Sequence, residues 1–287
     1  MANLKEIRNR ITSIGSTMQI TSAMKMVSAA KLKKAQDAIT QMRPYSDKLT
    51  QLLQSLSATL DADAGGAFAE QREVSKVLVI AITSNRGLCG GFNSSVIKGA
   101  TKHIDSSYKG KEVSVLAIGK KGGDLLSKQF NVIETNTEIF DNLTFDNVAE
   151  IAQKVMDLYV DGSFDKVEII YNQFKNAATQ ITQVEQFLPI EKIEGEEADS
   201  NSDYIFEPGK AEIILELIPK SLKTQLYKAI RDSYASEHGA RMTAMHKATD
   251  NASEMRDDLL LTYNKARQAA ITGEILEIVG GAEALNN

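Results

Sequence analysis

The sequence predicts an α/β protein that combines a long antiparallel coiled coil of the N- and C-terminal helices with an open α/β, Rossmann-like middle domain. Proline, the strongest helix breaker, is absent from residues 1–43 and 220–287, so both ends can form long helices. Between these ends, β-branched apolar runs alternate with helix-like stretches, which is typical of an open α/β sheet. We expect an N-terminal coiled-coil helix over 1–60, the α/β domain over 72–190, an acidic loop and foot segment over 191–207, and a C-terminal coiled-coil helix over 209–287.

The first predicted helix carries apolar residues at alternating spacings of three and four, which is the seam of a coiled coil. The average spacing of 3.5 residues predicts a left-handed supercoil. The seam consists of Leu4, Ile7, Ile11, Ile14 and Met18, then Leu32, Ala35, Ile39 and Met42, then Leu49, Leu53, Leu56 and Leu60.

The middle of the chain changes to short apolar runs separated by amphipathic stretches. We expect strands at 74–83, 112–119, 131–140, 166–174 and 179–190, and helices near 93–108, 120–129 and 144–160. The stretch 191–203 carries six acidic residues against one lysine, so it is predicted to be a surface loop.

The last predicted helix repeats the seam pattern and extends beyond its partner. Its seam residues are Met245, Ala248, Ala252, Met255, Leu259, Thr262, Ala266, Ala269, Gly273 and Leu276. If the two helices meet near residues 58 and 209, Leu4 lies beside a residue near 263, and about 20 residues remain unpaired. This unpaired end is apolar and therefore requires a protein partner; it contains Ile271, Ile275, Leu276, Ile278 and Val279.

Composition excludes several classes of protein. No apolar run reaches the roughly 20 residues of a membrane span, so we do not expect an integral membrane protein. One cysteine and three histidines make disulfide or zinc chemistry unexpected. The N-terminus has no apolar stretch of the signal-peptide type, so we expect a cytoplasmic chain that begins here. Residues 1–50 carry nine Lys and Arg against three Asp and Glu, a charge that suits either an anionic ligand or acidic protein neighbours.

The glycine-rich segment SNRGLCGGFN at 84–93 allows an enzyme as an alternative. A turn between a strand and a helix can bind phosphate, although this one matches neither common phosphate-binding motif. Cys89 could also replace the serine of a nucleophile elbow, and it would then need a histidine beside it. We expect His238 and His246 to lie on the terminal helix outside the sheet domain, and His103 near the far end of the helix after the turn.

A third possibility is a coiled-coil scaffold or a nucleic-acid-binding protein that uses the basic first helix. Residues 1–43 contain no Phe, Tyr or Trp on which bases could stack, which argues against nucleic acid as a partner.

Three segments resemble the gamma subunit of F-type ATP synthases of the bacterial type. They are IRNRITSIGSTMQITSAMKMVSAAKLKKAQ, SNRGLCGGFN and SEHGARMTAMHKATDNA with the later LTYNKARQAAITGEILEIVGGAEAL. The resemblance implies a central-stalk rotor whose coiled coil turns inside a hexamer of alpha and beta subunits. It further implies a foot on the epsilon subunit and the c ring, catalysis on beta rather than on this chain, no cofactor, and a peripheral location on the cytoplasmic face of the plasma membrane.

The resemblance also implies contact residues. In this reading, Arg267, Gln268, Met24, Lys25 and Arg86 contact beta; Ile275, Leu276, Ile278 and Val279 lie in an alpha–beta bearing; and Tyr204, Phe206 and Glu207 face the c ring and epsilon. Two positions are unusual. Asn85 stands where the family usually has an acid. Lys25 falls on the seam where an apolar residue is expected, which fits either an outward contact or a stutter in the coiled coil.

Overall fold

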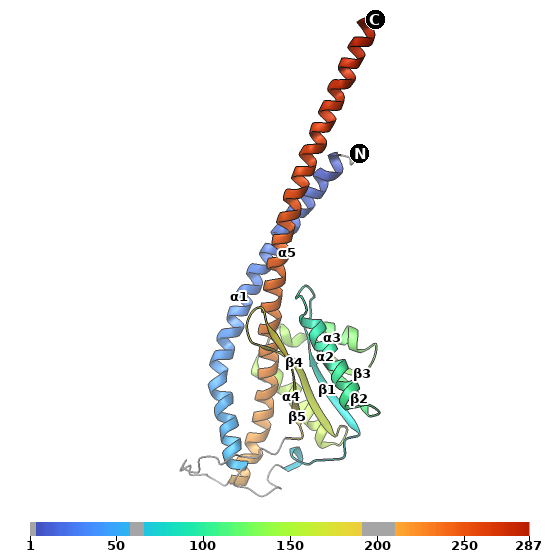
Figure 1. The fold of residues 1–287 in the computed structure, drawn as a ribbon. Helices are drawn as coiled ribbons and strands as arrows, with labels where there is room; N and C mark the ends of the chain where they lie inside the picture. Colours follow the sequence, from blue (N-terminus) through green and yellow to red (C-terminus); the bar gives the residue numbers. More distant parts are fainter. Residues whose placement is uncertain (1–3, 58–65, 191–209, 287) are drawn as a thin grey trace. The chain divides into compact units, whose positions relative to one another are not determined.

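The computed structural model describes residues 4–57, 66–190 and 210–286 and divides into two compact units (Figure 1). The coiled-coil unit comprises residues 1–28 and 242–287, and the sheet unit comprises residues 29–241. Two long helices, α1 (Leu4–Ser57) and α5 (Lys210–Asn286), contribute to both units. The predicted fold class is confirmed.

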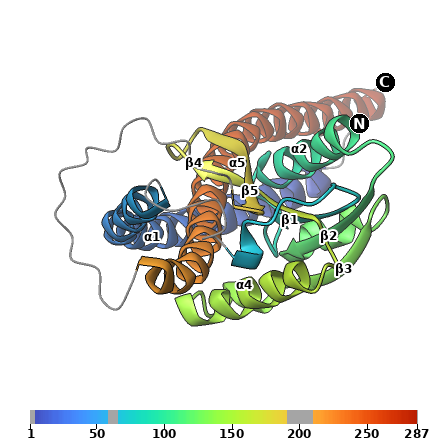
Figure 2. The same ribbon diagram turned by 90° about the horizontal axis from the view of Figure 1, so that it is seen from below.

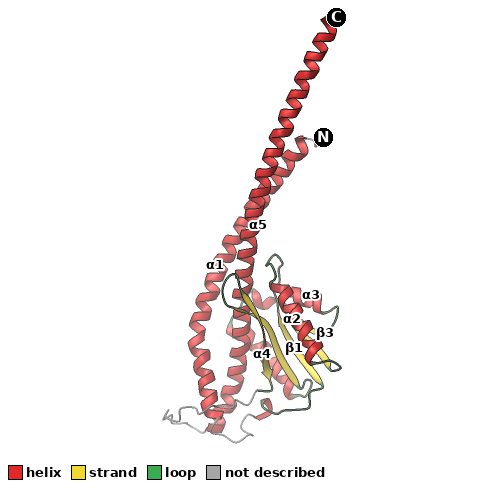
Figure 3. Cartoon of the chain, in the orientation of Figure 1, coloured by secondary structure: helices red, strands yellow, loops and turns green. Residues whose placement is uncertain are grey.

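The sheet unit contains one sheet, drawn in yellow in Figure 3, whose five strands have the order β3-β2-β1-β4-β5. The first four strands are parallel, and β5 pairs with β4 in the antiparallel direction. The strands are β1 (Lys76–Ile82), β2 (Glu112–Ile118), β3 (Asn131–Asn136), β4 (Lys166–Phe174) and β5 (Gln180–Leu188). The intervening helices are α2 (Phe92–Ser107), α3 (Lys120–Leu126) and α4 (Phe145–Val160), with short 3-10 helices η1 (Gly66–Phe68) and η2 (Glu138–Phe140).

Helices cover both faces of this sheet (Figure 2). Alternate residues of β1 point to opposite faces, so Leu78 and Ile80 pack with α4 and α5, whereas Val77 and Val79 pack with α2. All four side chains are fully buried. Burial on both faces explains why β1 reads as a continuous apolar run rather than an alternating one.

All five predicted strands are present, but the third is shorter than predicted. The sequence favoured a strand over 131–140, whereas β3 ends at Asn136 and residues 138–140 form η2. The amide of Asn85, from the loop after β1, donates to the Thr137 carbonyl at 2.7 Å. The Thr137 carbonyl thus bonds to a side chain instead of to the backbone of a neighbouring strand, and the chain leaves the sheet at this point.

Within the sheet unit, the part of α5 from residue 229 to 241 is buried on nearly all sides, with Tyr234 and Arg231 the half-buried exceptions. Small side chains allow this close packing. A Cβ placed on Gly239 would lie 3.2 Å from Cα of Ala177, in the β4–β5 loop. The segment also contains buried charged groups, which need internal partners because water cannot reach them.

The predicted seam on α1 is confirmed in this unit at Leu32, Ala35, Ile39 and Leu49, which are all buried, while Met42 is half-buried. The side chains of Leu53 and Leu56, and residue Leu60, lie outside what the structure describes. Leu49 lies beyond Pro44, so the helix and its buried face continue past the proline. The two helices run antiparallel. Lys31 of α1 interacts electrostatically with Glu237 of α5, and Tyr45 interacts with Lys220.

In the coiled-coil unit, Thr21 of α1 and Thr249 of α5 hydrogen-bond through their hydroxyls at 2.8 Å. Buried Thr21 and Ser28, with half-buried Lys25 between them, fill the part of the α1 seam that the apolar pattern skipped. The spacing of three and four therefore continues through Lys25 without a stutter. Extending the register at equal rise places Leu4 level with about residue 266, within one turn of the prediction.

The predicted seam on α5 is partly wrong. Met255 is 56% exposed, and the half-buried residues are the next ones along, Arg256, Tyr263 and Ala270 in place of Met255, Thr262 and Ala269. Counted from buried Ala252, Met255 is three residues on and Arg256 is four residues on. Both positions lie on the same side of a helix as Ala252, so spacing alone does not decide which of the two turns toward α1. The crossing direction of the two helices decides it.

Substitutions at two glycines distinguish the energetic cost of backbone strain from that of a steric clash. Gly119 and Gly110 both have positive φ, at 101° and 84°, but a Cβ on Gly119 would lie 2.4 Å from the Thr83 carbonyl oxygen, whereas one on Gly110 meets nothing within 4 Å. We expect Gly110→Ala to cost about 1–2 kcal/mol. We expect Gly119→Ala to cost at least about 2 kcal/mol more because the backbone must move. Urea unfolding of the two variants measures the difference, and equal losses would contradict the clash.

Candidate functional site

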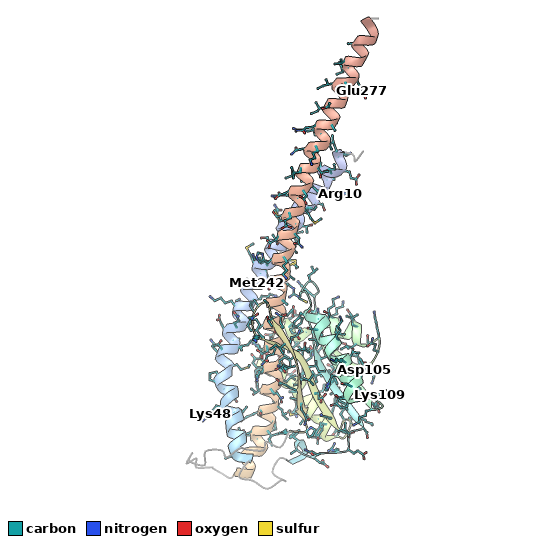
Figure 4. The ribbon with its side chains drawn as sticks, in the orientation of Figure 1. Arg10, Lys48, Asp105, Lys109, Met242 and Glu277 are labelled. Carbon is teal, nitrogen blue, oxygen red and sulfur yellow. The ribbon has the colours of Figure 1, made fainter. Side chains whose placement is uncertain are left out.

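The C-terminal part of α5 exposes a group of large apolar side chains. The exposed fractions are 47% for Ile271, 55% for Ile275, 66% for Leu276, 72% for Ile278 and 53% for Val279. Leu4, the first described residue of α1, is level with about residue 266, so these residues extend past the described part of α1. Figure 4 labels Glu277 in this part of α5, beyond the level of Arg10 on α1.

Arg267 and Gln268 lie on the exposed surface of α5 just before this apolar end. Among the residues that the structure describes, Arg267 has no salt-bridge partner. Its planar guanidinium is therefore available to bind carboxylates in the bidentate geometry that arginine favours.

Met24 and Lys25 are half-buried in the seam of the coiled-coil unit. Nζ of Lys25 lies 3.3 Å from Nδ1 of His246, so the side chain points toward α5 rather than outward. The apolar residues that do face outward here were missed by the sequence analysis. They are Ile20, Met26 and Val27, which are 57–65% exposed, and their position off the three-four ladder was the available signal.

The turn between β1 and α2 carries Arg86, whose side chain is exposed. Its backbone is held from two sides. The hydroxyl of Ser84 donates to the Arg86 carbonyl at 2.6 Å, and Nη2 of Arg241 donates to the same oxygen at 3.1 Å. Arg241 also reaches the Gly87 carbonyl at 3.4 Å. The turn is thus tied to α5 within the sheet unit.

Asn85 uses both ends of its amide in this turn. Its Nδ2 donates to the Thr137 carbonyl, and its Oδ1 accepts from the Lys120 backbone N–H at 3.0 Å. A carboxylate could accept from Lys120 but could not donate to Thr137. The asparagine therefore has a structural role that a carboxylate could not fill in this arrangement.

Cys89 lies inside the turn and is 2% exposed, packed with Phe92 and with Ala240 of α5. Its Sγ is 3.2 Å from Nδ2 of Asn93 and 3.7 Å from Oγ of Ser84. These hydrogen bonds join the thiol to neutral amide and hydroxyl groups. The elbow-like geometry places the sulfur toward the protein interior, which is the opposite of what an accessible nucleophile requires.

The hydrogen bonds of the three histidines in the described residues do not include this thiol. His103 binds Glu168, with Nε2 and Oε2 2.6 Å apart. The expectation that His238 lies outside the sheet domain is wrong, because it belongs to the sheet unit and is 5% exposed. His246 belongs to the coiled-coil unit, as expected. The error arose because the sequence did not show how far α5 packs against the sheet.

Glu168 is the centre of a separate polar cluster between α2 and β4. Although burial alone would raise its pKa, hydrogen bonds from Tyr108, Lys166 and His103 hold the pKa of the Glu168 carboxyl below its usual range. Burial and the same carboxylate raise the pKa of Tyr108. The cluster satisfies a buried charge with three donors, so we assign it a structural role.

Arg241 and Glu237 form a buried ion pair one turn apart on α5, with Nη1 and Oε1 separated by 2.6 Å. Burial raises the pKa of the Glu237 carboxyl, while the positive charges of Arg241, Lys31 and Arg86 act in the opposite direction. Because Arg241 also binds the carbonyls of Arg86 and Gly87, this pair joins α5 to the β1–α2 turn.

His238 completes this cluster. Its ring packs edge-on against Tyr234, with centroids 4.5 Å apart. Burial, with the positive charges of Arg241 and Lys31, lowers the pKa of the His238 imidazole to about 3. The ring is therefore neutral at pH 7.

Tyr204, Phe206 and Glu207, predicted to contact the c ring and epsilon, lie outside the described residues. Over residues 4–57, 66–190 and 210–286, no helix has the length and apolar character needed to cross a membrane. The same described ranges contain no group of three or more His, Cys, Asp or Glu residues arranged to hold a metal ion.

We predict that Arg241→Met destabilises the chain by about 3–5 kcal/mol, because it leaves the Glu237 carboxylate buried without its partner. The double variant Arg241→Met/Glu237→Leu should recover at least about 1 kcal/mol, since no charge then remains buried. Arg10→Met, which removes an arginine that pairs with Glu6 on the exposed surface of α1, is the control and should cost less than about 1 kcal/mol. Urea unfolding measures all three. A double variant as unstable as the single one would contradict this account.

We also predict that His238 makes the folded state less stable in acid. Its folded pKa is about 3, so between pH 6.5 and 3 the unfolded state binds a proton that the folded state does not. The stability present above pH 6.5 is lost as the pH falls, by about 2 kcal/mol between pH 7.5 and pH 5. The difference in unfolding free energy between these pH values, compared with that of His238→Gln, isolates this contribution. Equal differences in both proteins would show that His238 titrates normally.

Comparisons with known proteins identify the family. A family model described as ATP synthase matches residues 3–285. The ATP synthase gamma chain of Flavobacterium psychrophilum is 73% identical over 285 residues, covering 99% of both chains, and that of Christiangramia forsetii is 65% identical over the full length of both.

Solved structures show the same fold. A chain of the Euglena gracilis mitochondrial ATP synthase superposes with a TM-score of 0.71 at 20% identity, covering 98% of this chain and 94% of that one. A chain in the central stalk and c-ring structure of the Tetrahymena thermophila mitochondrial ATP synthase is 26% identical with a TM-score of 0.61, covering 80% of this chain and 99% of that one. On the family match and the full-length identities, the chain belongs to the gamma chains of F-type ATP synthase.

Proposed function

We propose that this chain is the central-stalk rotor subunit of its ATP synthase and has no active site of its own. In this proposal, rotation of the c ring driven by ions turns the chain, and the chain changes the conformation of catalytic sites on the beta subunits. Family membership supports the proposal. So does the similarity to the Tetrahymena chain, whose structure is described as a central stalk with its c ring.

The observation that carries the proposal is the exposed apolar end of α5. Five large apolar side chains between 271 and 279 are 47–72% exposed and occur on more than one side of the helix. Covering a fully exposed side chain of this kind contributes about 1.5–3 kcal/mol, so a surrounding apolar sleeve stabilises this end more than water does. A sleeve of alpha and beta subunits fits a helix that must turn inside it, because apolar contacts are not directional.

The proposed polar contacts, unlike the apolar ones, depend on the orientation of the two groups. Arg267 and Gln268 are positioned on the surface of α5 to bind acidic side chains of a beta-subunit loop. Arg86 on its fixed turn, and the partly exposed Met24 and Lys25 on α1, are proposed to contact acidic residues of the beta subunit.

The remaining assignments concern the foot and the location of the complex. Tyr204, Phe206 and Glu207 are proposed to contact the c ring and epsilon. The segments 1–60, 72–190, 191–207 and 209–287 are proposed as first helix, α/β domain, foot and second helix. The chain is proposed to be a peripheral membrane protein on the cytoplasmic face of the plasma membrane, held there through the complex.

We predict that Arg267→Ala lowers ATP hydrolysis by a reconstituted complex of this chain with alpha and beta subunits about tenfold, because a charge-assisted contact to beta is lost. Lys265→Ala is the matched control, since Lys265 is an exposed cation two residues away on the same helix. It should retain more than about half of the activity. Turnover of Arg267→Ala equal to that of the control would argue against the proposed contact.

Deleting residues 271–287 tests the proposed sleeve. We expect the truncated chain to bind alpha and beta at least tenfold more weakly, since several buried apolar contacts disappear. The cooperative melting of the sheet unit should remain, because its described core clusters contain no residue beyond Ala240. Full-strength assembly of the truncated chain would refute the sleeve.

A further inference from the structure

The β1–α2 turn presents a leucine whose conformation and exposure the sheet unit does not account for. Leu88 has φ of 62°, in the left-handed region that glycine adopts readily and bulky residues rarely adopt. It is the one residue other than glycine with positive φ among the described residues. Glycines stand at 87, 90 and 91, so the turn already uses them freely.

The side chain of Leu88 is also 67% exposed. None of the sheet unit's described core clusters includes it, whereas its neighbour Cys89 is buried with Phe92 and Ala240. A glycine at 88 would remove both the strained conformation and the exposed apolar surface. The stability of the folded unit therefore does not explain the leucine, and strain that persists in a fold is a reason to look for function.

The backbone that presents Leu88 is fixed on its N-terminal side. The carbonyl of Arg86 accepts from Oγ of Ser84 at 2.6 Å and from Nη2 of Arg241 at 3.1 Å, and the Gly87 carbonyl accepts from the same nitrogen at 3.4 Å. Arg241 is itself held by Glu237. A side chain on such a turn loses little further backbone freedom on binding, which favours a specific contact.

The charge beside Leu88 indicates what kind of surface it meets. Arg86, two residues earlier, is exposed on the same turn. A guanidinium and a leucine presented together fit a partner surface that offers a carboxylate next to an apolar socket.

We propose that Leu88 is a contact residue that inserts into an apolar socket, bordered by carboxylates, on the protein partner of this turn. The proposal rests on the function proposed above, in which that partner is the beta subunit, and adds a contact to the one assigned to Arg86. Arg241 serves as a positioning residue, since it holds the carbonyls of Arg86 and Gly87, the two residues before Leu88.

The test compares full-length Leu88→Gly, Leu88→Met and Leu125→Ala with the unchanged chain. Glycine fits the backbone at φ 62° without the side chain, methionine keeps an apolar side chain, and Leu125 is a leucine of another element, α3, that is 44% exposed. Two readouts are needed: the melting temperature of each isolated chain, and its apparent dissociation constant for purified alpha and beta subunits.

We expect Leu88→Gly to melt no lower than the unchanged chain and to bind alpha and beta about tenfold more weakly. Leu88→Met and Leu125→Ala should bind within about twofold. If Leu88→Gly binds within twofold while the unchanged chain binds tightly, the contact is refuted and the rotor function stands. Failure of the unchanged chain to bind refutes both. A melting temperature lowered by more than about 4 °C in Leu88→Gly would show that Leu88 stabilises the unit itself, which also overturns the proposal.

Discussion

The sheet unit depends on the buried stretch of α5 between residues 229 and 241. A helix that is buried on nearly every side must satisfy two conditions at once. Its side chains must be small enough for close approach, as at Gly239 and Ala240, and its charges must find partners inside the protein. Arg241 meets the second condition by binding Glu237 and the carbonyls of the β1–α2 turn, so the same contact that neutralises a buried charge also fixes a surface turn.

The contacts of Arg241 also explain how the polar groups of the glycine-rich turn are used. In an open α/β sheet the loop after the first strand is a common ligand site, because backbone N–H groups face the crevice. Here the Ser84 backbone N–H is taken by Oδ1 of Asn93 at 2.9 Å, and Arg241 occupies the carbonyls of Arg86 and Gly87. The turn uses its polar groups internally and leaves Arg86 and Leu88 facing outward, which suits a surface that contacts another protein.

In the coiled-coil unit the unpartnered groups are exposed apolar side chains rather than buried charges. Its two helices pack against each other along the seam, for example where Thr21 hydrogen-bonds Thr249. However, α5 continues past the level of Leu4, the first described residue of α1. Beyond that level the large apolar residues of α5 are exposed and have no partner among the described residues. The outward-facing Ile20, Met26 and Val27 extend this apolar exposure to α1. A function in assembly follows from this exposure together with membership of the gamma chain family.

The helices and strands of this protein follow from local patterns in its sequence. Apolar spacing is a local property, so the seam of α1, the five strands and the unpaired apolar end of α5 could be predicted from it. The tertiary structure decided which residues of α5 turn toward α1, since Met255 and Arg256 are both compatible with the spacing and only the helix crossing distinguishes them. It also decided that His238 is buried in the sheet unit and that Lys25 faces α5. These outcomes depend on contacts between segments far apart in the chain, and a local pattern carries no record of which distant segment will pack against it.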